Sequence, residues 1–185
     1  NHLCTLTHQI GFNNLNFDYP IIHEFLLNYN TYTSPEQIIK ELYAKAQDII
    51  DKQNQDFFRD TVAIRKQDCK IHQLDLFKIW HYNNAARKTS LKALQISMNY
   101  PNVMESKVPH TKEDITLEEV EDILEYNLND VMSTYEFYLR SKEKLKLRNQ
   151  FIESYNLPCE NFSDTKIGEQ LILKLYCDST GKKWY

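Results

Sequence analysis

The sequence predicts an α/β protein that is rich in helix. Apolar residues recur at helical spacing over several long segments, whereas two shorter runs, residues 3–12 and 70–80, have the alternation and β-branched residues of strands. Only 3 of the 185 residues are glycine and 5 are proline, which favours long helices with few tight turns over a sandwich or barrel. With 42% hydrophobic residues, the chain can bury one sizeable core and is too short for two ordinary domains.

Composition and charge exclude several classes of protein. The 4 cysteines are scattered without a Cys-x-x-Cys pair, so neither a zinc knuckle nor a disulfide framework is predicted. No apolar run is long enough to span a membrane and no signal peptide is visible, so we expect a cytoplasmic protein without a membrane partner. The formal net charge of −4 is unlike that of a protein that coats nucleic acid generally.

The first predicted strand, residues 3–12, leads into a turn at Gly11 and then a helix. Asp18 stands two residues before Pro20 and an apolar run, so it is expected to cap this helix with Pro20 in the first turn. Asn13, beside the glycine, is a typical turn former. Both polar residues therefore have a structural explanation, although a carboxylate fixed at a helix start is also well oriented for a cation.

A loop over residues 28–33 separates this helix from a second one. Ser34-Pro35-Glu36 opens the second helix, which is expected to reach about Asn54. Its predicted buried side consists of Ile38, Ile39, Leu42, Ala46, Ile49 and Ile50. A charged segment follows, with a short strand predicted at 62–64, and residues 70–80 then form the second main strand, with Leu74, Leu76 and Phe77 in the sheet.

The loop 81–89 places aromatic and basic side chains next to one another. Bases of a single strand can stack on Tyr82 while Arg87, Lys88 and Lys92 meet phosphates, which makes this loop the expected nucleic-acid edge. The alternative interpretation is a polar loop with solvated charges.

A long helix is predicted over residues 116–138. Thr116 and Glu119 form a capping box, and the expected core stripe consists of Val120, Ile123, Leu124, Val131, Tyr135 and Tyr138. Tyr126 and Asp130 lie one turn apart, on a flank well away from that stripe. Taken alone, this pair also fits a half-buried tyrosine beside a solvated aspartate.

Residues 90–115 and 140–177 are predicted to contain helices separated by irregular stretches. Residues 90–98 are expected to form a short amphipathic helix, and 99–115 an irregular crossing. The basic run 140–148 is typical of a solvated helix face, although near a nucleic-acid path it would add sequence-independent attraction. Pro158 marks a break, and Ser163-Asp164 caps a last helix to about Cys177, whose apolar side consists of Ile167, Leu171, Ile172 and Leu175.

Two of these segments carry motifs that resemble the DEDDy 3′–5′ exonucleases that proofread for DNA polymerases, especially those of phages and other family B enzymes. Their second motif reads Asn, three residues, aromatic, Asp, one residue, Pro, and its matches here are Asn13, Phe17, Asp18 and Pro20. Their third motif reads Tyr, three residues, Asp, and its matches are Tyr126 and Asp130. The two motifs fall in the family's order and at a plausible separation.

The family's first motif, Asp-x-Glu on the opening strand, has no match in this sequence. We therefore expect an internal fragment of an RNase H-like exonuclease fold that lacks its N-terminal strands and first two carboxylates. The resemblance implies an N-terminally truncated exonuclease domain at residues 1–148 and a helical extension at 149–185 that leads toward a polymerase module in cis. It also implies a structural role for Asp75, because an aspartate is common in the equivalent strand without being a metal ligand.

The chemistry implied by the resemblance is two-metal hydrolysis of single-stranded DNA from its 3′ end, with two Mg²⁺ or Mn²⁺ ions. Asp18 and Asp130 would be metal ligands and Tyr126 would orient the nucleophile. The implied nucleic-acid contacts are Asn13, Phe17, Tyr82, Arg87, Lys88 and Lys92. Location would be the host cytoplasm for a phage protein, and the isolated piece is expected to be inactive. The competing hypothesis is a non-catalytic nucleic-acid-binding or interaction module derived from that fold.

Overall fold

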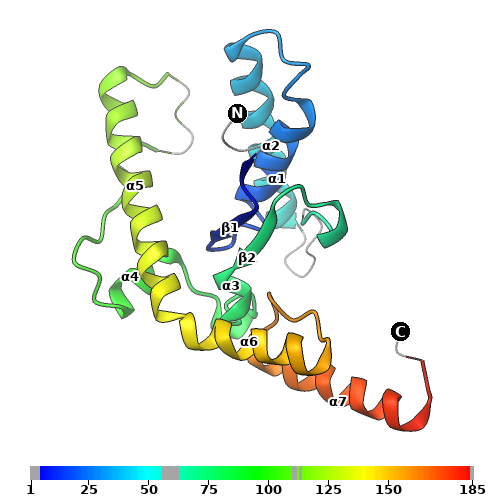
Figure 1. Cartoon of the computed structure of the whole chain (residues 1–185). Coiled ribbons are helices and arrows are strands. Elements are labelled where there is room, and N and C mark those ends of the chain that lie inside the picture. The colour runs from blue at the N-terminus through cyan, green and yellow to red at the C-terminus, as the bar shows by residue number, and fades with distance from the viewer. Residues whose placement is uncertain (1–4, 56–62, 110–111, 113, 184–185) are drawn as a thin grey trace. The chain divides into compact units, whose positions relative to one another are not determined.

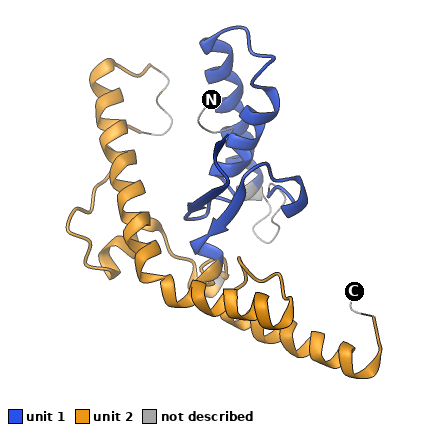
Figure 2. Cartoon of the chain, in the orientation of Figure 1, with its two compact units in different colours: residues 1–78 blue, residues 79–185 orange. Residues whose placement is uncertain are grey.

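The computed structural model describes residues 5–55, 63–109, 112 and 114–183. It is an α/β structure, rich in helix, with a small two-stranded parallel sheet (Figure 1). The predicted α/β class is therefore confirmed. The chain forms two compact units, residues 1–78 and 79–185 (Figure 2). The domain boundary expected at 148/149 lies within a helix and stays a prediction.

Unit 1 contains the sheet, two longer helices and shorter helical segments. Strand β1 (His8–Gly11) pairs in parallel with β2 (His72–Asp75), so that the last residues of both strands lie side by side. Helix α1 (Asp18–Asn28) contacts helix α2 (Pro35–Gln55), and the short helix η2 (Lys66–Asp68) precedes β2. The first strand is confirmed in a shorter form, with residues 1–4 outside the described residues.

The second helix agrees closely with its predicted range, but only part of its predicted buried side is buried. Ile49 is fully buried, whereas Ile39 and Ile50 are exposed. Helical spacing identifies the apolar face of a helix, and the packing elements decide how much of that face is covered.

The strand predicted over residues 70–80 is wrong in its second half. Strand β2 ends at Asp75, and the next residues form helix α3 (Leu76–Ile79). The Asp75 carboxylate accepts a hydrogen bond from the Phe77 backbone N–H at 3.0 Å, which satisfies a donor in the first turn of that helix. Of the short strand predicted at 62–64, Val62 lies outside the described residues, and Ala63 and Ile64 are not in a strand.

Unit 2 is built from helices. It contains η3 (Ala85–Arg87), α4 (Leu91–Ser97), α5 (Leu117–Arg140), α6 (Lys142–Tyr155) and α7 (Asp164–Thr180). Ser90 and Ser163 cap α4 and α7 through their side chains, and the capping box of Thr116 and Glu119 opens α5 as predicted. The described part of 99–115 is irregular, also as predicted.

The buried side of α5 is not the one predicted. Val120, Leu124, Val131 and Tyr135 of the expected core stripe are exposed, whereas the buried residues are Asn129, Ser133 and Phe137. The covered face packs against α4 and against an aromatic group that includes Trp80 and Tyr82. The helix therefore buries its more polar side within unit 2.

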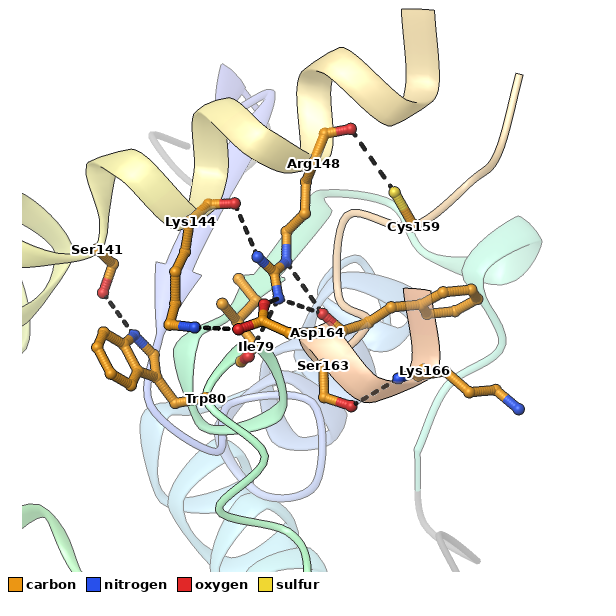
Figure 3. A network of polar contacts seen from close by, with 10 residues as sticks. Ile79, Trp80, Ser141, Lys144, Arg148, Cys159, Ser163, Asp164 and Lys166 are labelled. Atoms are coloured by element: carbon orange, nitrogen blue, oxygen red, sulfur yellow. Dashed lines mark hydrogen bonds and ion pairs between the residues drawn. The ribbon is translucent and has the colours of Figure 1, made fainter. Parts of the chain in front are cut away.

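Arg148 on α6 is also buried, against the expectation of a solvated basic face (Figure 3). Its guanidinium donates hydrogen bonds to the carbonyl oxygens of Phe162 (2.6 Å), Lys144 (2.7 Å) and Ile79 (3.1 Å), and to Asp164 Oδ1 (2.9 Å). A planar group with five N–H donors can satisfy several acceptors at once, which makes its burial possible. Arg148 thereby ties α6 to the start of α7 and to the end of α3.

Two further contacts hold the same region (Figure 3). Lys144 pairs with Asp164 and lies over the Trp80 ring, whose Nε1–H donates to Ser141 Oγ at 2.9 Å. A small apolar core beside this network consists of Leu157, Cys159 and Ile167 with Phe151, Ile152, Phe162 and Leu171 packed on it. None of the helices in the described part of the chain has the length and apolar character needed to cross a bilayer.

Candidate functional site

The turn between β1 and α1 in unit 1 carries Asn13 and Phe17, which match the second exonuclease motif. Asn13 adopts a left-handed backbone conformation with φ of 63°, which asparagine tolerates better than most residues. Its backbone N–H donates to Asp75 Oδ1 at 2.8 Å, and the Leu15 N–H donates to Asp75 Oδ2 at 3.2 Å. Asp75 thus fastens the turn to the end of β2, which confirms its expected structural role.

Asp75 itself is fully buried. Desolvation raises the pKa of its carboxyl to about 6, although N–H donors from Asn13, Leu15 and Phe77 and the charge of Lys78 act in the opposite direction. A buried carboxylate that is held by backbone donors sets the shape of the turn. It is not presented to solvent.

Gly11 and Asn14 explain why this turn needs its glycine. A Cβ at Gly11 would lie 2.6 Å from Asn14 Cβ, far inside van der Waals contact. Asn14 cannot move freely, because it is buried and its Nδ2 donates to Gln73 Oε1 at 2.7 Å. Its carbonyl oxygen accepts from the Tyr19 N–H at 2.8 Å, which leads the chain into α1.

Asp18 is the first residue of α1 and is exposed. The expectation that it caps the helix is wrong, because the N-cap position is Phe17 and no side chain makes the capping hydrogen bond. Pro20 does lie in the first turn, as predicted. Although the residue as a whole is exposed, protein atoms around the carboxyl raise its pKa, and its own backbone N–H lowers it to a smaller extent. Asp18 is thus a surface carboxylate beside the Asn13–Phe17 turn.

Tyr126 and Asp130 lie on α5 in unit 2 and interact with each other. The Tyr126 hydroxyl lies beside the Asp130 carboxylate, and Gln95 Nε2 on α4 donates a hydrogen bond to Asp130 Oδ1 at 3.1 Å. Burial raises the pKa of the Asp130 carboxyl, while the neighbouring Tyr126 hydroxyl and the Gln95 amide lower it. Burial and the negative charge of Asp130 both raise the pKa of the Tyr126 phenol.

The predicted pairing of Tyr126 and Asp130 on one face is therefore confirmed. The expectation that this flank lies away from the packed side of α5 is wrong, because the same side carries the buried Ser133 and Phe137. Gln95 was not predicted as a site residue. The available signal was a glutamine next to Leu94 and near Met98, both of which are buried on the inner side of α4.

The described residues do not complete a metal centre. No three His, Cys, Asp or Glu side chains gather as a metal ion would require in the ranges that the structure covers. Asp18 belongs to unit 1 and Asp130 to unit 2, so each unit contributes one of the two predicted carboxylates. Around Asp130 the neighbouring polar groups are amides and a phenol, and a buried Asn129 Nδ2 lacks a described partner. Among the described residues of either unit, the available oxygens do not fit a pair of divalent cations, which need several charged oxygens.

The predicted nucleic-acid residues differ in how accessible they are. Tyr82 is half-buried and stacked on Trp80, with ring centroids 6.3 Å apart, and it also stacks on Phe137. Arg87 and Lys88 are exposed on and after η3. Lys92, the remaining basic residue of this set, forms an ion pair with Glu105. In unit 1, Asn13 and Phe17 are half-buried.

The chain thus presents a Tyr–Asp pair on one helix face in one unit and an exposed aspartate after a fixed turn in the other. No protein-family model, curated protein or solved structure matches it.

Proposed function

We propose that this chain is part of a 3′–5′ exonuclease of the DEDDy type, with an RNase H-like fold, that trims single-stranded DNA ends as the proofreading domain of a phage-like DNA polymerase. The observation that carries this proposal is the Tyr126–Asp130 pair, whose hydroxyl and carboxylate lie next to each other, half-buried, on α5. The turn from Asn13 to Asp18 supports it, because a parallel strand leads through this turn to Asp18, an exposed residue at the start of a helix.

The roles proposed for these side chains follow from their protonation. The Tyr126 pKa is raised, so the phenol is protonated at neutral pH and acts as a hydrogen-bond donor that orients a neighbour, and not as a base. Asp130 accepts a hydrogen bond from Gln95 and lies beside the Tyr126 hydroxyl, and the bond from Gln95 directs its carboxylate. The proposal includes Mg²⁺ or Mn²⁺ as the catalytic ions. Besides Asp18 and Asp130, the carboxylate ligands of these ions would come from outside the described residues.

The test uses the protein encoded by the natural reading frame that contains these 185 residues. We expect it to shorten a 5′-labelled single strand from the 3′ end in the presence of Mg²⁺, and we expect Asp130→Asn and Asp18→Asn to abolish this activity. Asp122→Asn is the matched control for Asp130, because Asp122 lies on the same helix in a surface ion pair with Lys107. Full digestion by Asp130→Asn would refute the site assignment.

A second candidate function is binding of single-stranded nucleic acid without cleavage. It is favoured by the exposed Arg87 and Lys88, which follow closely after the stacked pair Trp80 and Tyr82. Such binding should weaken as salt rises and show little sequence preference. Anisotropy of a labelled single strand measures it, and binding without any shortening, unaffected by Asp130→Asn, would favour this function over the exonuclease.

A further inference from the structure

We propose that Gln95 is the positioning residue of Asp130: its buried side-chain amide fixes the direction in which the Asp130 carboxylate points. The inference rests on the proposed function, because it concerns the same Tyr126–Asp130 site. Gln95 lies on α4, 35 residues before Asp130 in the sequence, and is only 1% exposed. A glutamine in such a place needs polar partners, since a buried amide without hydrogen bonds is costly.

The partners of Gln95 are both on α5. Its Nε2 donates to Asp130 Oδ1 at 3.1 Å and to Ser133 Oγ at 2.8 Å. The Ser133 hydroxyl donates its own proton to the Asp130 carbonyl oxygen at 3.0 Å, so Ser133 Oγ can only accept from Gln95. A carboxylate oxygen likewise only accepts. The amide nitrogen, and not the amide oxygen, must therefore face this pair, and its two N–H bonds serve one acceptor each.

This arrangement has a direct consequence for the site. Asp130 is half-buried on α5, and the Gln95 amide approaches its carboxylate from α4, a different helix. Ser133, which is fully buried, holds the amide itself in place. Because the donor is held by a second bond, the bonded Asp130 oxygen has a preferred direction. Gln95 thus keeps the carboxylate aligned from a buried position.

The first test is an NMR titration of the 185-residue chain without metal or DNA. One of the two Nε2 protons of Gln95 should shift with pH at the same midpoint as the Asp130 carboxyl carbon. The side-chain amide of Gln150, exposed on α6, should not follow that midpoint and serves as the control. A Gln95 amide that stays unchanged while Asp130 titrates would overturn the proposal.

Two substitutions sharpen this test. Gln95→Leu keeps the approximate size but removes the donor, so the Asp130 pKa should move upward; Gln95→Glu adds a like charge and should move it upward further. Ser133→Ala, which leaves the Gln95–Asp130 bond in place, should move it much less. An Asp130 pKa that is unchanged in a folded Gln95→Leu or Gln95→Glu variant would also overturn the proposal. The wild-type titration decides the matter if neither variant folds.

An activity arm separates this inference from the proposed function. In the natural protein, Gln95→Leu should lower kcat by about tenfold, the size expected for one hydrogen bond to a charged group, and move the acid limb of the pH profile upward. An inactive Asp130→Asn together with a wild-type pH profile in Gln95→Leu would refute the positioning role alone. If the Gln95 amide titrates together with Asp130 but Asp130→Asn keeps full activity, the proposed exonuclease site is refuted. The contact between Gln95 and Asp130 is then still supported.

Discussion

Two carboxylates in this chain are held in opposite ways, Asp75 in unit 1 and Asp130 in unit 2. Asp75 is fully buried and accepts hydrogen bonds from backbone N–H groups on three residues, so it is part of the framework. Asp130 is only partly buried and is held by two side chains, Gln95 and Tyr126. A carboxylate that is bound by backbone donors fixes the path of the chain. A carboxylate that is bound by side chains does not, so it can remain available for chemistry, as a site residue must.

The largest expected effect tests the framework role of Asp75. Asp75→Ala removes the acceptor of three N–H groups, that of Phe77 buried and those of Asn13 and Leu15 partly buried, and we expect a loss of about 3 kcal/mol or more in the free energy of unfolding of unit 1. Urea denaturation measures the loss, and hydrogen exchange at the amides of Asn13, Leu15 and Phe77 locates it. Asp130→Ala, the matched change in unit 2, leaves a single N–H, that of Gln95, without its acceptor and should cost about 1–2 kcal/mol. Equal losses at both positions would remove the contrast.

The pH dependence of stability tests the same contrast through charge. The pKa of Asp75 is raised in the folded chain to about 6, so between about 4 and 6 the folded state binds more protons than the unfolded state. Stability from this group is therefore greatest at low pH, falls as pH rises through this window by roughly 2–3 kcal/mol, and is constant above it. Urea midpoints from pH 4 to 7 measure the change, and the slope should be reduced in Asp75→Asn. An unchanged slope in that variant would assign the titration to another group.

Much of the helical structure could be predicted from the sequence because its signals are local. The caps at Ser90, Thr116 and Ser163 and the proline at 35 each act within one turn, and the predicted starts of these helices agree with the structure. The end of β2 could not be predicted in this way. Its partner β1 ends at Gly11, directly opposite Asp75, so the strand stops where its distant neighbour stops.

The site was predictable only in part for a related reason. The spacing of Tyr126 and Asp130 is local and gave their common face, but the choice of buried side on α5 depends on what packs there. The burial of Arg148 likewise depends on distant acceptors, the carbonyl oxygens of Ile79 and Phe162. The role of Gln95 depends on Asp130, which lies 35 residues later in the sequence. Composition marks these residues as polar, and only the packing shows that they are buried.

A smaller effect is expected at Gly11, which tests how rigidly the framework turn is fixed. A Cβ there would overlap Asn14 Cβ at 2.6 Å, and Asn14 is held by Gln73 and by the Tyr19 N–H. We expect Gly11→Ala to lower the free energy of unfolding by about 1–3 kcal/mol, as overpacking of a fixed neighbour does. Gly168→Ala is the control, because nothing lies within 4 Å of a Cβ at that helical position, and it should be neutral or slightly stabilising. A neutral Gly11→Ala would mean that the turn can relax around Asn14.

The smallest change in stability is expected at Tyr126, where the proposed role is chemical. Tyr126→Phe keeps the ring and removes only the hydroxyl beside Asp130, so the free energy of unfolding should fall by about 1 kcal/mol at most. The Asp130 pKa should rise, since one of the two neighbouring groups that lower it is lost. In the natural protein, exonuclease turnover should fall by roughly 10²-fold, the usual size of a contribution to proton transfer or positioning. Tyr135→Phe, an exposed tyrosine on the same helix, is the control and should change neither quantity. If Tyr126→Phe lost stability as Asp75→Ala does and left turnover intact, Tyr126 would belong to the framework, and the distinction between the two units would not hold.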